Sequence, residues 1–223
     1  MKPILLFDID GTLLHVKRKF LNGVIDKILA ELDISREILD GMSFAGRTDK
    51  DIFIELVSSQ EENDTLFEAV KKMYVAEMQK QLSEEQLDII DGAKKAVQFA
   101  VENKLEIGLC TGNFKEVAVA KVEAAGFYDL FHFGGYGCHH KDRAYLPGEA
   151  SRQHHRLTNR KTEPEQYIVI GDTPNDIRCA KAFGAKSVAV TTGGFSRRDL
   201  EMFEPDIVVD NLGNIDSWIE NFL

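Results

Sequence analysis

Short runs of consecutive apolar residues alternate along this 223-residue chain with longer segments whose apolar positions recur every three or four residues. The runs are typical of buried strands, and the longer period is typical of helices. Strands are predicted at Ile4–Phe7, Leu105–Cys110, Tyr167–Ile170, Ser187–Val190 and Ile207–Val209. Helices are predicted at Ala93–Asn103, Val117–Ala125 and Asn175–Phe183. This alternation predicts an α/β fold, a doubly wound parallel sheet covered on both faces.

Residues 15–90 break the alternation, because three helical patterns follow one another there without a convincing strand between them. The patterns cover Phe20–Leu32, Thr48–Val57 and Asp64–Leu82. We predict that residues 15–90 form an inserted helical cap subdomain, and that residues 1–14 and 91–223 form a Rossmann-like core. The two crossings, near Leu14–His15 and Ile89–Asp91, are expected to be hinges.

Net charge limits the expected binding partners, and cysteine content indicates the cellular compartment. The chain carries 27 basic and 37 acidic residues, a net charge of −10, which disfavours nonspecific binding to nucleic acid or anionic lipid. Its three cysteines are far apart in sequence, which favours a reducing compartment. The apolar run Ile4–Phe7 is too short for an export signal or a membrane span. We therefore expect a cytoplasmic protein with no nucleic-acid or membrane partner, and the sequence does not indicate its oligomeric state.

Polar residues follow three of the predicted strands at their carboxyl ends. In an open parallel sheet, ligands bind beyond these ends, where the strand order reverses. A single aspartate in such a loop is often only a turn former or a helix cap. Six polar residues on three such loops are harder to explain in that way, and they predict one ligand site. They are Asp8, Asp10, Thr111, Asn113, Asp172 and Asp176.

Four converging carboxylates would place a charge of −4 in this site. Two like charges about 4 Å apart repel by about 4 kcal/mol at an effective dielectric constant near 20. Such a site must protonate, spread out or bind a cation. Oxygen ligands without nearby soft donors favour Mg²⁺, which commonly takes a substrate phosphate as a further ligand. A lysine or arginine should then also line the pocket.

Three segments of the chain resemble, in chain order, the first, second and fourth motifs of the haloacid dehalogenase-like hydrolase superfamily. They are Asp8-Ile9-Asp10-Gly11-Thr12, Thr111 in Cys-Thr-Gly-Asn, and Gly171-Asp172-Thr173-Pro174-Asn175-Asp176. The helical insertion between the first two motifs resembles the helical-cap, phosphoglycolate phosphatase-like subgroup. The resemblance implies a phosphatase that hydrolyses a small phosphorylated metabolite, with Mg²⁺ as its cofactor. Dehalogenases of the superfamily lack an acid at the position of Asp10, because a halide leaves without a proton.

The resemblance also implies roles for individual residues. Asp8 would attack phosphorus and form an aspartyl-phosphate, and Asp10 would protonate the leaving oxygen and then activate water. Mg²⁺ would be held by Asp8, the backbone carbonyl of Asp10, and Asp172, with support from Asp176. Thr111 and the backbone of Gly112 and Asn113 would donate hydrogen bonds to phosphate, although Thr111 could equally cap the helix that follows.

The third, basic motif departs from the family pattern of Lys-Pro, since residues 138–147 offer two other cations. Arg143 lies nearer the expected distance before Asp172, and a guanidinium suits carboxylate or phosphate. Lys141 stays open as the alternative. The neighbouring His139 and His140 do not predict zinc, because adjacent side chains cannot easily face one metal ion.

Two residues of the cap segment are candidate substrate contacts. Arg47, in Gly46-Arg47-Thr48-Asp49, resembles the substrate-facing loop of helical caps and could bind an anionic group on the leaving portion. It could equally lie in water at a turn into a helix capped by Thr48. His15 lies just after the first motif and is a second candidate. Of the remaining motifs, Gly134-Gly135 is expected to form a turn, and His154-His155 a solvated helix face.

Two other functions stay open at this stage. A sugar phosphomutase of the same superfamily would share the aspartyl-phosphate but return the phosphoryl group to the sugar. A noncatalytic phospho-binding regulator, akin to a receiver domain, would also gather carboxylates around Mg²⁺. Receiver domains are shorter, however, and have no helical insertion after their first strand.

Overall fold

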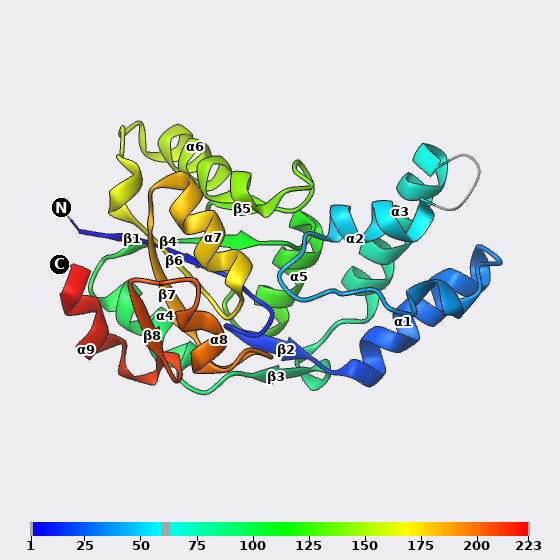
Figure 1. Cartoon of the computed structure of the whole chain (residues 1–223), viewed down its shortest axis with the longest axis horizontal. Helices are drawn as coiled ribbons and strands as arrows, with labels where there is room; N and C mark the ends of the chain where they lie inside the picture. The colour runs from blue at the N-terminus through cyan, green and yellow to red at the C-terminus, as the bar shows by residue number, and fades with distance from the viewer. Residues whose placement is uncertain (1, 59–62, 223) are drawn as a thin grey trace.

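A six-stranded parallel sheet forms the centre of the computed structural model, which describes residues 2–58 and 63–222. The strand order is β5-β4-β1-β6-β7-β8, so the first strand lies in the middle of the sheet (Figure 1). The strands are β1 (Ile4–Phe7), β4 (Glu106–Thr111), β5 (Gly134–Tyr136), β6 (Tyr167–Gly171), β7 (Lys186–Val190) and β8 (Ile207–Val209). This arrangement confirms the predicted α/β class with a parallel sheet.

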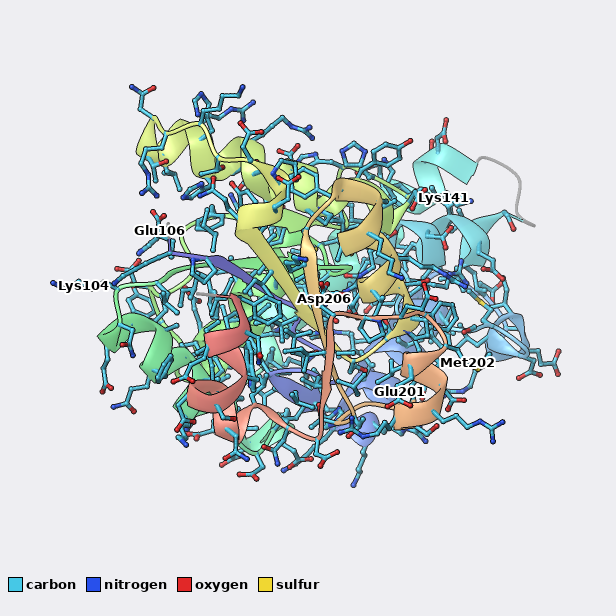
Figure 2. All side chains as sticks on the ribbon, turned by 60° about the vertical axis from the view of Figure 1, so that its left-hand side comes forward. Lys104, Glu106, Lys141, Glu201, Met202 and Asp206 are labelled. Atoms are coloured by element: carbon cyan, nitrogen blue, oxygen red, sulfur yellow. The ribbon has the colours of Figure 1, made fainter. Side chains whose placement is uncertain are left out.

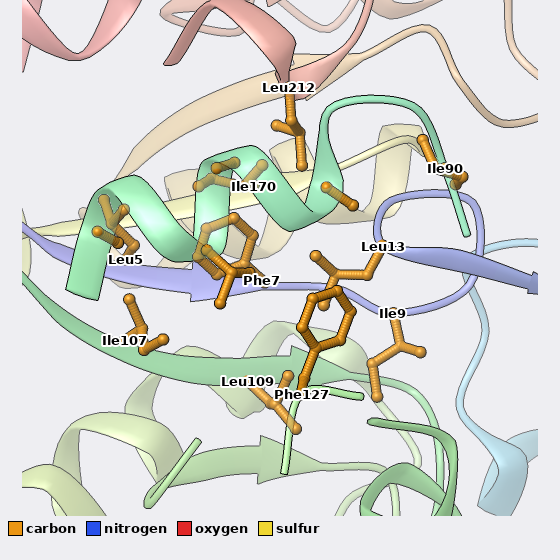
Figure 3. Packing of buried hydrophobic residues seen from close by; sticks show 14 of the residues in the cluster. Leu5, Phe7, Ile9, Leu13, Ile90, Ile107, Leu109, Phe127, Ile170 and Leu212 are labelled. Atoms are coloured by element: carbon orange, nitrogen blue, oxygen red, sulfur yellow. The ribbon is translucent and has the colours of Figure 1, made fainter. Parts of the chain in front are cut away.

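The continuous apolar run of β1 is explained by burial of both faces of the sheet. Side chains alternate between the two faces of a strand, so Leu5 and Phe7 pack into one core cluster and Ile4 and Leu6 into another. Figure 3 shows Leu5 and Phe7 within the first of these clusters. Neighbouring parallel strands cover the edges of β1, which pairs in register with β4 and β6. The carboxyl ends of these three strands therefore lie side by side.

Helices cover both faces of the sheet, as in other doubly wound folds. Helices α6 and α7 lie over one face, and α4 and α9 lie over the other (Figure 1). Their bounds, with those of α5 and α8, are α4 (Ala93–Glu102), α5 (Lys115–Ala124), α6 (Leu146–Thr158), α7 (Pro174–Phe183), α8 (Arg197–Glu201) and α9 (Ile215–Trp218). No helix in the described part of the chain has the length and apolar character needed to cross a bilayer.

The inserted segment is mainly helical and packs against one end of the core. It contains α1 (Arg18–Glu31), α2 (Asp49–Val57) and α3 (Asn63–Gln81), whose apolar faces share one cluster of buried side chains. Phe114 and Val117, at the start of α5, belong to the same cluster. Contact between the helical segment and the core is therefore made at the helix that follows β4.

Among the described residues no strand lies between the three predicted helical patterns, but two short strands at the ends of the segment were not predicted. Strands β2 (Leu14–Val16) and β3 (Leu87–Ile89) pair antiparallel where the chain enters and leaves the helical segment. Each strand has three residues, too few to produce a recognisable alternation, and backbone pairing with a distant segment defines them. The boundaries of the cap and the hinge role of its crossings stay predictions.

Two smaller expectations were wrong. Gly134 and Gly135 lie in β5, where a Cβ on Gly135 would lie 1.9 Å from the carbonyl oxygen of Leu146. His154 is fully buried rather than solvated, with Nδ1 3.1 Å from the Tyr167 hydroxyl, whereas His155 is exposed. In both cases close packing against another element, which no local pattern reveals, determines the environment.

Candidate active site

The three polar loops meet because β1 lies between β4 and β6. The chain leaves β1 for β4 on one side and later reaches β6 on the other, so the strand order reverses at β1. Asp8 directly follows β1, and its backbone N–H donates to the Ile170 carbonyl of β6 at 2.9 Å. Thr111 ends β4 and Asp172 directly follows β6, and the side chains of all three are buried. The tertiary structure therefore brings the loops to one edge of the sheet.

Three buried carboxylates form the centre of the site. Asp8, Asp172 and Asp176 each offer an oxygen, and these oxygens lie within 4.8 Å of one another. The guanidinium of Arg143 faces two of them, with Nη2 3.0 Å from Asp8 Oδ2 and a hydrogen bond to Asp176 Oδ1. Arg143 is itself buried, in a 3₁₀ turn over Arg143–Tyr145 that is capped by the side chain of Asp142. The carboxylates and this cation form one buried electrostatic unit.

Hydrogen bonds and close packing determine how two of these carboxylates point. Asp176 Oδ2 accepts hydrogen bonds from the backbone N–H (3.0 Å) and hydroxyl (2.7 Å) of Thr173, so α7 begins with a capping interaction. Its Oδ1 is thereby left to face Arg143. Asp172 Oδ1 accepts from the Thr12 hydroxyl at 3.2 Å. Gly11, with φ of +84°, passes so close that a Cβ there would lie 2.4 Å from Asp172 Oδ2. Only glycine suits that position.

Burial and mutual repulsion change the proton affinity of this cluster. Burial, together with Asp176 and Asp10, raises the pKa of Asp8 to about 6 against the opposing effect of Arg143. Burial, with Asp176 and Asp8, raises the pKa of Asp172 to about 8. Although burial by itself would lower the pKa of Arg143, the charges of Asp176 and Asp8 raise it well above its usual value. The cluster thus binds protons or cations more readily than isolated carboxylates do.

We expect the metal-free protein to lose thermal stability as the pH rises from 5 to about 8. Within this range the native Asp8, Asp49 and Asp172 still bind protons that the unfolded chain, with carboxyl pKa values near 4, has released, and Asp172 does so to the highest pH. Stability falls wherever the native state binds more protons than the unfolded state. The measurement is the melting temperature across this pH range, with and without MgCl₂, since a bound cation would replace the protons and flatten the slope.

Asp172→Asn is the matched variant for this prediction, because it removes the carboxyl with the higher pKa. Its melting temperature should depend less on pH and respond less to Mg²⁺ than that of the wild type. Carboxyls whose pKa values lie below their usual range, such as Glu106, complete their titration below this window. An identical slope in the wild type and the variant would contradict the assignment of the effect to this cluster.

A second group of polar side chains surrounds Asp10. Lys121 Nζ donates to both Asp10 oxygens, at 2.8 and 2.6 Å, and to Asn113 Oδ1 at 2.6 Å. Asn113 Nδ2 donates to Asp10 Oδ2 at 2.7 Å and to the Thr111 hydroxyl at 2.9 Å. Burial by itself would raise the pKa of Asp10, but the charge and hydrogen bonds of Lys121, with Asn113, lower it. Asp8 and Asp10, two residues apart, thus have opposite pKa shifts.

The helical segment contacts the loop after β4 directly. The backbone N–H of Asp49 donates to the Gly112 carbonyl at 2.7 Å, and Asp49 Oδ2 accepts from the Phe114 N–H at 2.8 Å. A Cβ on Gly112 would lie 2.1 Å from the Arg47 carbonyl oxygen, so a glycine is needed for this close approach. The Thr48 hydroxyl donates to the Lys141 carbonyl at 2.8 Å. The start of α2 therefore covers the loop that follows Thr111.

The two candidate cations of the third motif lie in different environments. Arg143 lies in the carboxylate cluster, whereas the side chain of Lys141 is 61% exposed at the surface and forms an ion pair with Asp51 at 3.3 Å (Figure 2). Lys141 is thus not brought into the cluster. Lys141 was an alternative because it is the other cation of residues 138–147, and the sequence does not reveal the direction of a loop side chain.

The two candidate substrate contacts, Arg47 and His15, differ in their interactions and exposure. The Arg47 guanidinium is paired with Asp51, at 2.6 Å, and with Glu55, at 2.5 Å, both on α2. To bind a substrate anion it would have to leave these carboxylates. His15 is exposed on β2, with Nε2 3.2 Å from the Thr192 carbonyl oxygen, and its charge contributes to the lowered pKa of Asp10.

Sequence reasoning missed two residues at the site, the buried Lys121 and the partly buried Asp49. The signal for Lys121 was present, because it follows Val117 and Ala118 on the buried face of α5, where a charged residue needs a partner. Asp49 was visible only as the residue after the helix cap Thr48. Burial raises the pKa of Asp49 to about 6, although Lys121 opposes the shift.

The known proteins that this chain is similar to are hydrolases of one family, and several are named as phosphatases. A model of the family described as haloacid dehalogenase-like hydrolase matches residues 5–190. A probable phosphatase, IndB, of Dickeya dadantii is 22% identical over 96% of this chain and 92% of its own length. A phosphoglycolate phosphatase of Rhodospirillum rubrum is 25% identical over 98% and 91%. The crystal structure of a predicted phosphoglycolate phosphatase from Haemophilus somnus superposes with a TM-score of 0.73, at 18% identity over 97% of both chains.

Proposed function

Because this chain belongs to the haloacid dehalogenase-like hydrolase family and is a phosphatase, we propose that it hydrolyses small phosphate monoesters through an aspartyl-phosphate on Asp8, with Mg²⁺ as cofactor. The observation that carries the proposal is the buried cluster of Asp8, Asp172 and Asp176 facing Arg143. In it, a nucleophile, a cation site and a cation suited to phosphate lie together.

The three carboxylates fit a Mg²⁺ ion. Their oxygens lie within 4.8 Å of one another, and oxygen donors are the ligands that Mg²⁺ prefers. The pKa of Asp172, raised to about 8, indicates that this carboxyl needs a nearby cation to be fully ionised at neutral pH, whereas Asp8, with a pKa raised to about 6, is mostly ionised there. When bound, Mg²⁺ would neutralise charge on the substrate phosphate and polarise it.

In the proposed reaction each nearby side chain has a separate task. A carboxylate oxygen of Asp8 forms a bond to phosphorus as the bond to the leaving oxygen breaks, and Asp10 supplies a proton to that oxygen. Asp10 then takes a proton from the water that attacks the aspartyl-phosphate, which restores Asp8. Thr111 and the backbone of Gly112 and Asn113 donate hydrogen bonds to phosphate oxygens.

Arg143 is proposed to hold Asp8 and the phosphate in line. Its Nη2 already contacts Asp8, whereas its Nε is buried without a hydrogen-bond partner among residues 2–58 and 63–222. An acceptor oxygen of a bound phosphate is the partner that we propose for it. An arginine suits this role because its planar group donates in two directions at once.

The cap segment is proposed to select the leaving group. Its contacts with the loop after Thr111 close the site, which would exclude water other than the attacking molecule. Arg47 and His15 are the proposed contacts for the leaving portion. The name of the Rhodospirillum rubrum relative supports phosphoglycolate as the first substrate to test, and we propose small sugar phosphates as the next. A cytoplasmic location also stays a prediction.

A phosphate-release screen over a panel of small phosphate esters tests this proposal. We expect release in the presence of Mg²⁺ and its loss with a chelator, restored by excess Mg²⁺. Hexose 1-phosphates are scored for the isomeric phosphate as well as for free phosphate, since isomer formation would indicate the phosphomutase. Activity that resists the chelator would contradict the metal assignment, and no turnover of any ester would favour the noncatalytic regulator.

A further inference from the structure

We propose that Lys121 is a positioning residue for Asp10: it holds the carboxylate where it can exchange a proton with the leaving oxygen and with the attacking water. This inference rests on the proposed function, in which Asp10 is the general acid and base. It concerns a residue outside the three motifs that resemble the family, on the buried face of α5.

Burying the charged side chain of Lys121 is energetically unfavourable unless other groups compensate for its lost hydration. The side chain is 4% exposed and lies on the same helix face as Val117, Ala118 and Val122. Removing an ammonium group from water is strongly unfavourable unless partners replace its hydration. Here three oxygens within 2.8 Å surround Nζ, namely both oxygens of Asp10 and Oδ1 of Asn113. The three donors of the ammonium are thus matched by three acceptors.

Asp10 depends on these contacts for its orientation. Its side chain is 43% exposed, on a loop, so water alone would allow several rotamers. Lys121 holds both carboxylate oxygens, and Asn113 Nδ2 holds Oδ2 at 2.7 Å. Asn113 in turn donates to the Thr111 hydroxyl. Lys121 therefore connects the proposed acid and base to the loop that is proposed to bind phosphate.

From these contacts we predict which reaction step becomes slower when Lys121 is replaced. Because the pKa of Asp10 is lowered, this group is a carboxylate in the free protein and must take up a proton from solvent before it can act as an acid. In the first step that proton moves to the leaving oxygen as its bond to phosphorus breaks, while Lys121 keeps its own proton. An alkoxide needs that proton in order to leave, whereas 4-nitrophenolate is stable enough to leave without it. Misplacing a catalytic group by about 1 Å typically costs on the order of 100-fold in rate.

The experiment measures kcat/KM for two substrates, an alkyl phosphate that the wild type hydrolyses and 4-nitrophenyl phosphate. Lys121→Met should lower kcat/KM for the alkyl ester by about 100-fold and for the aryl ester by less than about 5-fold. The reason is that kcat/KM reports the first step, in which only the alkyl leaving group needs the proton of Asp10, whereas the later attack of water is common to both esters. Methionine fills a similar space without charge, and circular dichroism checks the fold. Lys121→Gln, which keeps one amide donor, is the second variant if the first does not fold, with a selective loss of about 10-fold.

Lys115→Met is the matched control, since Lys115 is an exposed lysine on the same helix. It should leave both rates within about twofold of the wild type, as expected for a surface change. An equal loss on both esters in a folded Lys121 variant would overturn the positioning role and leave only a structural one. Failure of the wild type to release phosphate from either ester would instead overturn the proposed function.

Discussion

Replacing Asp8 with asparagine is expected to lower kcat/KM by on the order of 10⁴-fold or more, because the amide cannot act as the nucleophile toward phosphorus. The substitution is nearly isosteric. It also removes one of three mutually repelling carboxylates, so the fold should be retained. The measurement is phosphate release from the best ester of the screen, together with acid quenching after a labelled substrate. The wild type should retain transient label, and the Asp8→Asn protein none.

Asp129→Asn is a suitable control for this result. Asp129 lies in an exposed loop at φ of +55°, a conformation that asparagine also tolerates. Its activity should match that of the wild type. Substantial turnover by a folded Asp8→Asn protein would exclude the covalent mechanism, even if the requirement for Mg²⁺ were retained.

Replacing Arg143 with methionine is expected to lower the free energy of unfolding of the metal-free protein by about 3–5 kcal/mol at pH 8. The substitution leaves Asp8, Asp172 and Asp176 buried and repelling one another without the cation that faces them. The loss should be smaller at pH 5, where the raised pKa values of Asp8 and Asp172 allow both to be protonated in the native state. Denaturant unfolding at the two pH values measures the difference.

Lys141→Met is the control for Arg143→Met, because it removes the other candidate cation of the same segment. Lys141 is largely exposed and pairs with Asp51 at 3.3 Å, so the expected change is within about 0.5 kcal/mol. Equal destabilisation by the two substitutions would contradict the buried electrostatic unit. A similar loss in the Arg143 variant at pH 5 and pH 8 would show that packing, rather than charge, explains it.

Comparison with the sequence-based expectations shows which features have local causes. Five of the six core strands, all except β5, were predictable because each is a largely apolar run that ends in glycine or polar turn formers. For the same reason Asp8, Thr111 and Asp172 could be assigned to the ends of strands before their contacts were known. Strands β2, β3 and β5 were not predictable, because β2 and β3 have a polar residue at their centre and β5 begins with two glycines. None of them is a continuous apolar run, as the equally short β8 is.

The sequence by itself determined the class of fold and the polar loops at one edge of the sheet, because apolar periodicity and strand ends are properties of neighbouring residues. Only the tertiary structure decided that Arg143 rather than Lys141 faces the carboxylates, and that Lys121 bonds Asp10 from a helix otherwise typical of core packing. The physical reason is that burial of a charge depends on partners brought together over long stretches of chain, as with Lys121 and Asp10, 111 residues apart.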